Sequence, residues 1–197
     1  MEIKDRYGKP NYVLSIDEAV LRPVENTTAF KIMRVIVLTP IVLLILLSII
    51  VEDNIFADLP RGHVVLWVII VWYLLKHKNK EWSPSPMELL FFDDRLILYL
   101  PKRYYSKSVT RMELHELKYS DITKCMYKEK SQRIHIYGSG VATWWNYKAD
   151  GTPVKTATRV NEYKDGLVYF NTRLANGVDF KKEIEGHSPI KLVIENS

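Results

Sequence analysis

The sequence contains a single cysteine, Cys125, among its 197 residues. One cysteine cannot form an intramolecular disulfide, and it cannot build a cysteine-based zinc site. Its position in a strand-like stretch beside Lys124 favours a small buried thiol over a reactive one. The first 30 residues are mixed and polar, so no cleavable signal peptide is expected there.

Motifs of catalysis are also absent. The sequence has no H-E-x-x-H, no nucleophile elbow and no P-loop, and its five histidines are scattered. His115 and His135 fall on predicted strands, where the alternative to a surface position is a shared metal. Asp93-Asp94 is typical of a turn, where aspartate is favoured for backbone reasons. We therefore expect a non-enzymatic protein with no catalytic residues, no metal and no cofactor.

Positive charge is concentrated after residue 75. The segment from Lys76 to Ser197 has 21 Lys and Arg against 15 Asp and Glu. These basic residues are dispersed among acidic ones, and no nucleic-acid-binding motif accompanies them, so nucleic acid is not an expected partner. Membrane lipids are, because anionic headgroups attract basic surfaces by about 1 kcal/mol per well-placed cation.

Charge is missing altogether from Val35–Val51, VIVLTPIVLLILLSIIV. As a helix this stretch is roughly 25 Å long, close to the hydrocarbon thickness of a bilayer. Only a helix can take such a stretch through lipid, because its backbone groups must pair internally. The alternative is a buried helix of a soluble core. We favour a membrane span because a second apolar run follows.

The second run is His63–Leu75, HVVLWVIIVWYLL, which comes near spanning length with Leu59–Gly62. Basic residues lie outside the two runs and acidic residues lie between them, which by the positive-inside rule places the connector outside. We therefore predict a transmembrane helical hairpin over residues 31–82, with helices at about 32–51 and 60–76. The protein would be multi-pass in the inner (cytoplasmic) membrane, with both termini cytoplasmic.

Two segments flank this hairpin. Residues 1–30 form a cytoplasmic lead-in, in which Tyr12, Leu14 and Ile16 alternate as in a short strand. That strand either pairs with the C-terminal domain or remains loose. Ser83-Pro84-Ser85-Pro86 favours an extended link, so the domain boundary is placed there and residues 83–197 form the cytoplasmic β-domain.

The β-domain is predicted from short alternating segments. In Val109–Leu117, for example, Met112 and Leu114 fall on one face and Arg111, Glu113 and His115 on the other. A helix is expected over Ala175–Gly186, because Phe180 and Ile184 fall on one face at i, i+4, with Gly186 as its C-cap. The fold class is therefore an α+β membrane protein, with a two-helix hairpin followed by a curved antiparallel sheet or small barrel and a C-terminal helix.

The stretches MELLFFDDRLILYLPKR and ELKYSDITKCMYKEKSQRIHIY resemble the C-terminal domain of bacterial YcxB-like membrane proteins, and more loosely bacterial pleckstrin-homology-like (PH-like) domains. The matching motifs are Phe92-Asp93-Asp94, Tyr119-Ser120-Asp121-Ile122 and the region around Phe180–Gly186. The resemblance implies a hydrophobic hairpin joined to a cytoplasmic PH-like β-domain. It implies no chemistry for individual residues.

Two groups of residues are candidates for binding lipid or a partner. The first lies in one predicted strand connection and combines cations with amphipathic rings: Lys102, Arg103, Tyr104, Tyr105 and Lys107. The alternative for it is a solvated loop whose tyrosines pack on the barrel. The second is Trp144-Trp145, where alternation predicts one core and one exposed ring. An exposed tryptophan suits an interface, and packing against the following loop is the alternative.

These features together predict a membrane-anchored, non-enzymatic binding or scaffold protein that presents a PH-like domain at the cytoplasmic face. Its partners would be membrane lipids, anionic headgroups among them, a protein, or another copy of itself. The alternative is an accessory subunit of a membrane transport or toxin-immunity system that acts through its transmembrane hairpin.

Overall fold

The structure is a computed structural model that describes residues 7–50, 61–104 and 110–195. It divides into two compact units, each treated by itself: Met1–Arg22 together with Trp82–Ser197, and Pro23–Glu81. The first unit holds the sheet and a short helix, and the second holds two apolar helices. The predicted α+β class is confirmed at this level.

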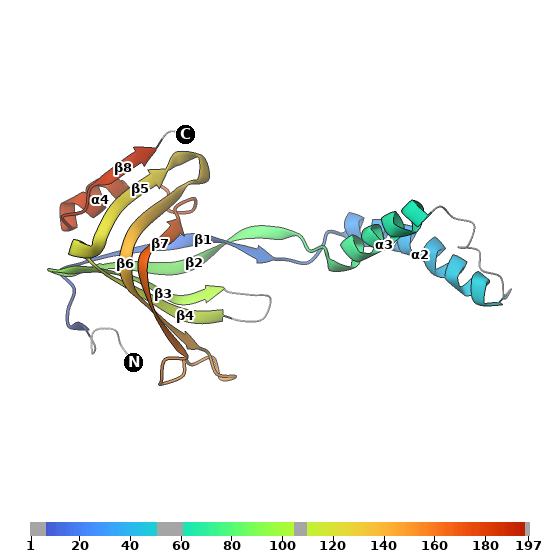
Figure 1. Ribbon diagram of the computed structural model, residues 1–197, viewed down its shortest axis with the longest axis horizontal. Helices are drawn as coiled ribbons and strands as arrows, with labels where there is room; N and C mark the ends of the chain where they lie inside the picture. The colour runs from blue at the N-terminus through green and yellow to red at the C-terminus, as the bar shows by residue number, and fades with distance from the viewer. Residues whose placement is uncertain (1–6, 51–60, 105–109, 196–197) are drawn as a thin grey trace. The chain divides into compact units, whose positions relative to one another are not determined.

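The first unit is built on an eight-stranded sheet (Figure 1). The strands lie in the order β1-β2-β3-β4-β6-β5-β8, and β7 pairs with β6. The pairing of β5 with β8 is parallel, whereas the pairs β2–β3, β3–β4, β4–β6, β5–β6 and β6–β7 are antiparallel. The strand bounds are Tyr12–Pro23, Lys80–Phe91, Arg95–Tyr104, Thr110–Lys118, Ile122–Lys128, Arg133–Asn146, Arg159–Asn171 and Leu192–Glu195, for β1 to β8 in order.

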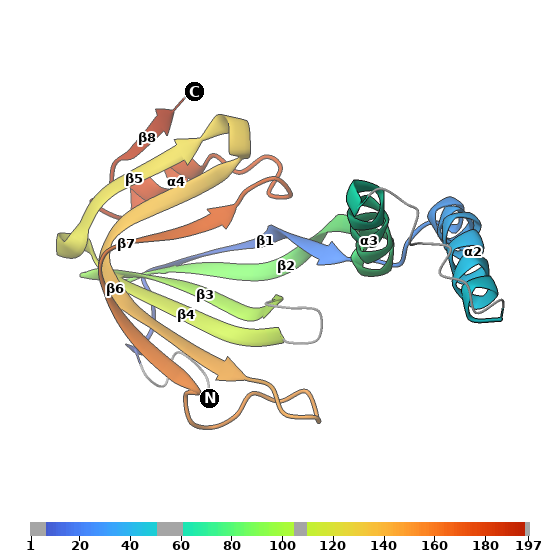
Figure 2. The same cartoon turned by 45° about the vertical axis from the view of Figure 1, so that its right-hand side comes forward.

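The sheet curls because β6 serves two sets of neighbours. Its first half pairs with β5 and its second half with β4, while β7 follows it along both halves. Figure 2 shows β6 and β7 bending together between these halves. Gly138 and Gly140 lie at the bend, where a β-bulge also interrupts the register with β7. The result is a half-barrel rather than a flat sheet.

One face of the curled sheet carries the main core. Alternate residues of β3 and β6 are fully buried in it, and Phe91 and Phe170 are its largest fully buried side chains. Cross-strand partners such as Leu96 and Leu117 share this face, as expected for antiparallel pairs. A smaller cluster covers the opposite face of β3 and β4, and its buried members are Leu90, Ile97, Met112, Leu114 and Trp145.

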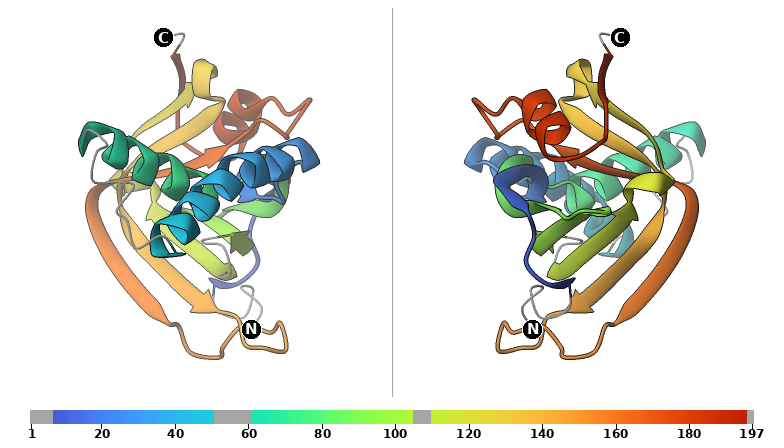
Figure 3. Two further views of the ribbon diagram at one scale, coloured as in Figure 1. Left: turned by 90° about the vertical axis from the view of Figure 1, so that its right-hand side faces the viewer. Right: turned by 90° about the vertical axis from the view of Figure 1, so that its left-hand side faces the viewer.

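Helix α4, Phe180–His187, packs on the main core near β8 (Figure 3). Asp179 caps its N-terminus by accepting a hydrogen bond from the backbone N–H of Lys182 at 3.0 Å. Phe180 and Ile184 are buried one turn apart. The helix begins five residues later than predicted, because the chain before Asp179 turns at Gly177, whose φ is +82°. It also continues past Gly186, so that residue is not its C-cap.

A hydrogen bond joins β1 to α4: the Tyr12 hydroxyl donates to Glu183 Oε2 at 2.6 Å, and its ring stacks on His187. Removing the hydroxyl in Tyr12→Phe is expected to lower the free energy of unfolding by about 1 kcal/mol, the typical net worth of one hydrogen bond. Hydrogen exchange of α4 amides measures the change. In a Glu183→Gln background the same substitution should cost less, and equal costs in both backgrounds would contradict this pairing.

The N-terminal strand pairs with the C-terminal domain and does not remain loose, which is the first of the two alternatives predicted for it. β1 is the edge strand next to β2, so residues up to Arg22 belong to the sheet unit. The predicted extended link at Ser83–Pro86 lies inside β2, and Ser85 is fully buried there. Its hydroxyl donates to the carbonyl of Lys102 at 3.2 Å. The unit boundary in the structure falls just before, between Glu81 and Trp82.

The second unit contains α2, Thr28–Ile50, and α3, Arg61–Lys76. Among the described residues one helical stretch, Thr28–Leu47, is long and apolar enough to cross a membrane, with a mean hydropathy of 2.4 and none of it buried. The apolar part of α3 is shorter, Val65–Lys76. One helix of spanning length is therefore present, and the structure does not establish the predicted two-helix membrane hairpin.

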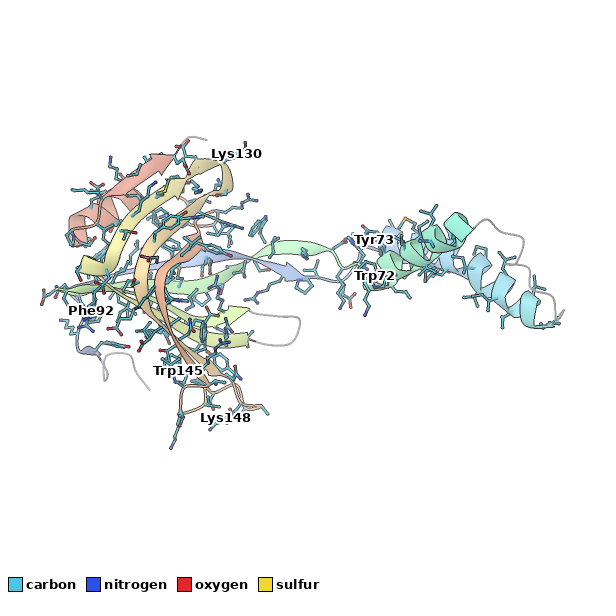
Figure 4. The ribbon with its side chains drawn as sticks, in the orientation of Figure 1. Trp72, Tyr73, Phe92, Lys130, Trp145 and Lys148 are labelled. Carbon is cyan, nitrogen blue, oxygen red and sulfur yellow. The ribbon has the colours of Figure 1, made fainter. Side chains whose placement is uncertain are left out.

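The ends of these two helices are tied together within their unit. The backbone N–H of Val24, before α2, donates to the carbonyl of Asn79, after α3, at 2.9 Å. Asn26 bridges the same segments, donating to the carbonyl of His77 at 3.0 Å and accepting from the N–H of Asn79 at 2.9 Å. The chain thus enters and leaves the helical unit at adjacent points. Trp72 and Tyr73, labelled in Figure 4, are exposed on α3.

Candidate functional site: a buried charge network

The first group of predicted binding residues is described only in part. Lys102 is exposed, whereas Arg103 is largely enclosed and paired with two carboxylates. Tyr104 is the last residue of β3. Tyr105 and Lys107 lie outside the described residues, so the proposed headgroup site around them stays a prediction.

Glu113 is the centre of a charge network on the face that carries the main core. It sits on β4 opposite Leu100 of β3, and only 1% of the residue is exposed. Arg103 Nη1 donates to its Oε2 at 2.9 Å, and Arg111 Nε donates to its Oε1. His115 Nε2 lies 3.5 Å from Oε2. A single carboxylate therefore holds three basic side chains from two strands.

Arg103 also reaches a second buried carboxylate, Glu18 on β1. Arg103 Nη2 lies 3.7 Å from Glu18 Oε1, and that oxygen accepts a hydrogen bond from the backbone N–H of Asn171 on β7 at 3.3 Å. The other oxygen of Glu18, Oε2, is buried without a hydrogen-bond partner among the described residues. Glu18 thus bridges β1 and β7, two strands that do not pair with each other in the described residues.

The two carboxyl groups have opposite pKa shifts. Burial acts to raise the pKa of Glu113, but hydrogen bonds from His115 and Arg111 and the charge of Arg103 outweigh it and lower the pKa to about 2. Burial raises the pKa of Glu18, and Arg103 and the Asn171 N–H oppose it only in part. Glu113 is therefore held as a firm anion, whereas Glu18 is the more readily protonated of the two carboxyl groups.

The tryptophan pair divides between the two faces of β6. Trp145 is 2% exposed in the smaller core cluster, while Trp144 is half-buried on the face of Glu113, its partner on β4. The guanidinium of Arg111 lies 5.1 Å from the Trp144 ring centroid, and that of Arg159 lies 5.5 Å from it. Cation–π contacts therefore extend the charge network from β4 to β7.

The histidines do not form a metal site in the described residues. His115 pairs with Ala142 of β6, and His135 is seven residues from Ala142 on the same strand, so the two histidines lie on opposite faces. No cluster of three metal-ligating side chains occurs in residues 7–50, 61–104 and 110–195. Cys125 is buried in the main core, which raises the pKa of its thiol to about 12.

The network joins β1, β3, β4, β6 and β7 through side chains, so its arrangement suits closure of the half-barrel. Its basic groups face carboxylates or a tryptophan ring, and Arg103 is not presented to a ligand. The sequence patterns predicted Arg103 and Trp144 as binding residues and assigned no role to Glu18 or Glu113. The available signal was a charged residue continuing an inward alternation, as Glu18 does after Leu14 and Ile16.

Comparisons with known proteins add no relative: a scan of protein-family models, a search of curated proteins and a search of solved structures each find no match to this chain.

Proposed function

We propose that the protein is a non-enzymatic binding module anchored in the cytoplasmic membrane by a helical hairpin, with a PH-like half-barrel as its binding domain. The observation that carries the proposal is the exposed apolar surface of the second unit. Side chains along α2, such as Val35 and Ile36, are exposed by 63% and 66%. Apolar surface of this extent is stable only against lipid or another protein.

The tie between Val24 and Asn79 supports the hairpin form of this proposal. If α2 crosses the bilayer, its start and the end of α3 lie on the same side, so α3 must return. The short apolar part of α3 can span with its flanking lysine snorkelling to the headgroups. Basic residues cluster at these tied ends, namely Lys31, Arg34, Lys76, Lys78 and Lys80, which supports a cytoplasmic location for both termini.

The alternative, an accessory subunit of a transport or toxin-immunity system, draws on the same exposed helices. In that case α2 and α3 would contact other membrane subunits, and Trp67 and Trp72, both exposed, would be suitable contact residues. Deleting the sheet unit separates the two functions. Retention of partner binding by the helical unit alone would favour the subunit, and its loss would favour the half-barrel.

Membrane topology is the direct test of the proposal. In a Cys125→Ala background, a cysteine introduced at Asn54, in the connector, should react with an impermeant maleimide added to intact cells. A cysteine at the exposed Lys155 should react only after lysis. The chain should also stay with the membrane pellet at alkaline pH. Release into the supernatant, or labelling of Lys155→Cys from outside, would refute the anchored hairpin.

A further inference from the structure

The half of the sheet formed by β8, β5, β6 and β7 has a face that the main core does not use. Its core-facing residues are Cys125, Ile134, Ile136, Val168, Phe170 and Leu192. The residues between them therefore point to the other face, and cross-strand register brings them together. His135 pairs with Met126 and Tyr169, and Tyr137 pairs with Lys124 and Leu167. We call these residues, with Lys128, Arg133 and Val193, the outer face.

The outer face combines exposed apolar residues with amphipathic rings. Leu167 is 44% exposed, Tyr169 40% and Val193 50%. The rings of His135 and Tyr169 are 5.7 Å apart, and those of His135 and Tyr137 are 6.1 Å apart. Aromatic rings with polar tips beside exposed aliphatic side chains are typical of surfaces that meet the membrane interface.

The outer face is also positively charged. It carries Lys124, Lys128 and Arg133 against Glu195, which lies 3.3 Å from the Lys128 ammonium. The guanidinium of Arg133 lies over the Tyr169 ring, 5.1 Å from its centroid. Burial lowers the pKa of His135, with the charges of Lys128 and Arg133 adding to the effect. The face therefore carries three cations against one carboxylate, a net positive charge that suits anionic headgroups.

We propose that this outer face docks on the anionic headgroups of the membrane that holds the helical unit. The inference rests on the proposed membrane anchor and names the surface through which the half-barrel contacts lipid. Cations bind the headgroup phosphates, the tyrosine rings lie at the interface, and Leu167 and Val193 meet the acyl boundary. A second copy is disfavoured as occupant, because two such faces would bring like charges together. Nucleic acid would leave the exposed aliphatic residues unused.

The test uses the full chain in lipid nanodiscs, with Cys125→Ala and a solvent-sensitive fluorophore on Leu167→Cys. The matched control carries the fluorophore on Val160→Cys, because Val160 lies on the same strand and is 58% exposed but sits opposite Thr143, at the other half of β7. In discs with anionic lipid, nitroxide-labelled lipid should quench the fluorophore at 167 and not at 160. In neutral discs, or at high salt, the quenching at 167 should be lost.

A charge variant tests the same contact. In anionic discs, Lys124→Glu should lower the apparent affinity of the outer face for lipid, measured by the quenching at position 167, by about fivefold or more. This is the effect of roughly 1 kcal/mol per basic residue. Lys148→Glu makes the same charge change in the exposed loop after β6. Figure 4 shows that Lys148 lies far from Lys130, which marks the turn between β5 and β6 beside the outer face, so this variant should leave the quenching unchanged.

Three outcomes would overturn the proposal. Equal quenching at 167 and 160, or none at either, means that the outer face does not dock on lipid. Shielding of 167 in native membranes but not in pure-lipid discs assigns the face to a protein partner. Failure of the chain to remain in the discs refutes the membrane anchor as well. If the chain remains in the discs but lipid does not quench the fluorophore at 167 more than that at 160, this inference alone is refuted.

Discussion

Replacing Glu113 with glutamine is expected to lower the free energy of unfolding of the sheet unit by about 3 kcal/mol. The substitution keeps the shape of the side chain but removes the charge that pairs with Arg103 and Arg111, and Arg103 then keeps its 3.7 Å contact with Glu18. Buried cations left without a counter-charge are costly, and breaking a buried pair from one side typically costs 3–5 kcal/mol. Hydrogen exchange of β4 and β6 amides, in the full chain in detergent micelles, measures the loss.

The pH dependence of this effect has a defined sign. The pKa of Glu113 is about 2 in the folded protein and about 4.5 in the unfolded chain. The folded state therefore binds fewer protons between these values, so the stabilisation is complete above about pH 4.5 and is lost as the pH falls toward 2. The Glu113→Gln variant should lack this loss, and its stability should approach that of the unsubstituted chain in acid.

Glu18→Gln is the matched control, because it makes the same change in a buried carboxyl that shares Arg103. Here the folded pKa is raised, so ionisation at neutral pH works against folding, and lowering the pH should relieve it. Glutamine keeps an acceptor for the Asn171 N–H. We expect a change within about 1 kcal/mol at pH 7. A loss as large as that of Glu113→Gln would contradict the assignment of Glu113 as the centre of the network.

Local patterns predicted the elements more reliably than their pairing. Alternation placed Met112 and Glu113 on opposite faces of β4, and the i, i+4 spacing of Phe180 and Ile184 placed α4. These features depend on a few neighbouring residues. The partner of each strand depends on more distant residues. β4 pairs with β6 and not with β5, the next strand in the sequence, and β1 pairs with β2 although both helices of the second unit separate them in the sequence. Such contacts follow from packing that a single sequence does not display.

The binding residues were predicted from short runs for the same reason, and this is where the prediction is weakest. The connection that contains Arg103 reads as a basic, aromatic surface, but in the fold Arg103 turns toward Glu18 and Glu113. Conversely, the residues of the outer face appear dispersed in the sequence, because Lys124, Arg133 and Tyr169 come from three strands. Their grouping required the register of β5, β6 and β7.

The bend of β6 provides the second large effect. A Cβ atom at Gly138 would lie 2.3 Å from the carbonyl oxygen of Asp121 and 2.9 Å from the Cα atom of Ile122. Both are backbone atoms, so no side chain can move aside to make room. Gly138→Ala is therefore expected to lower the free energy of unfolding by about 3 kcal/mol or more, since the strand must shift away from the start of β5. Hydrogen exchange of β5 and β6 amides should show the loss in both strands.

Gly186→Ala is the control of opposite sign. Gly186 lies in the last turn of α4, and a Cβ atom there would meet nothing within 4 Å. Alanine favours a helix over glycine by up to about 1 kcal/mol, so this variant should be more stable than the unsubstituted chain. If Gly138→Ala were tolerated as well as Gly186→Ala, the close approach of β6 to the Asp121 carbonyl would be wrong. The curl that brings Glu18 to Asn171 would then need another cause, because the charge network closes only a sheet that is already bent.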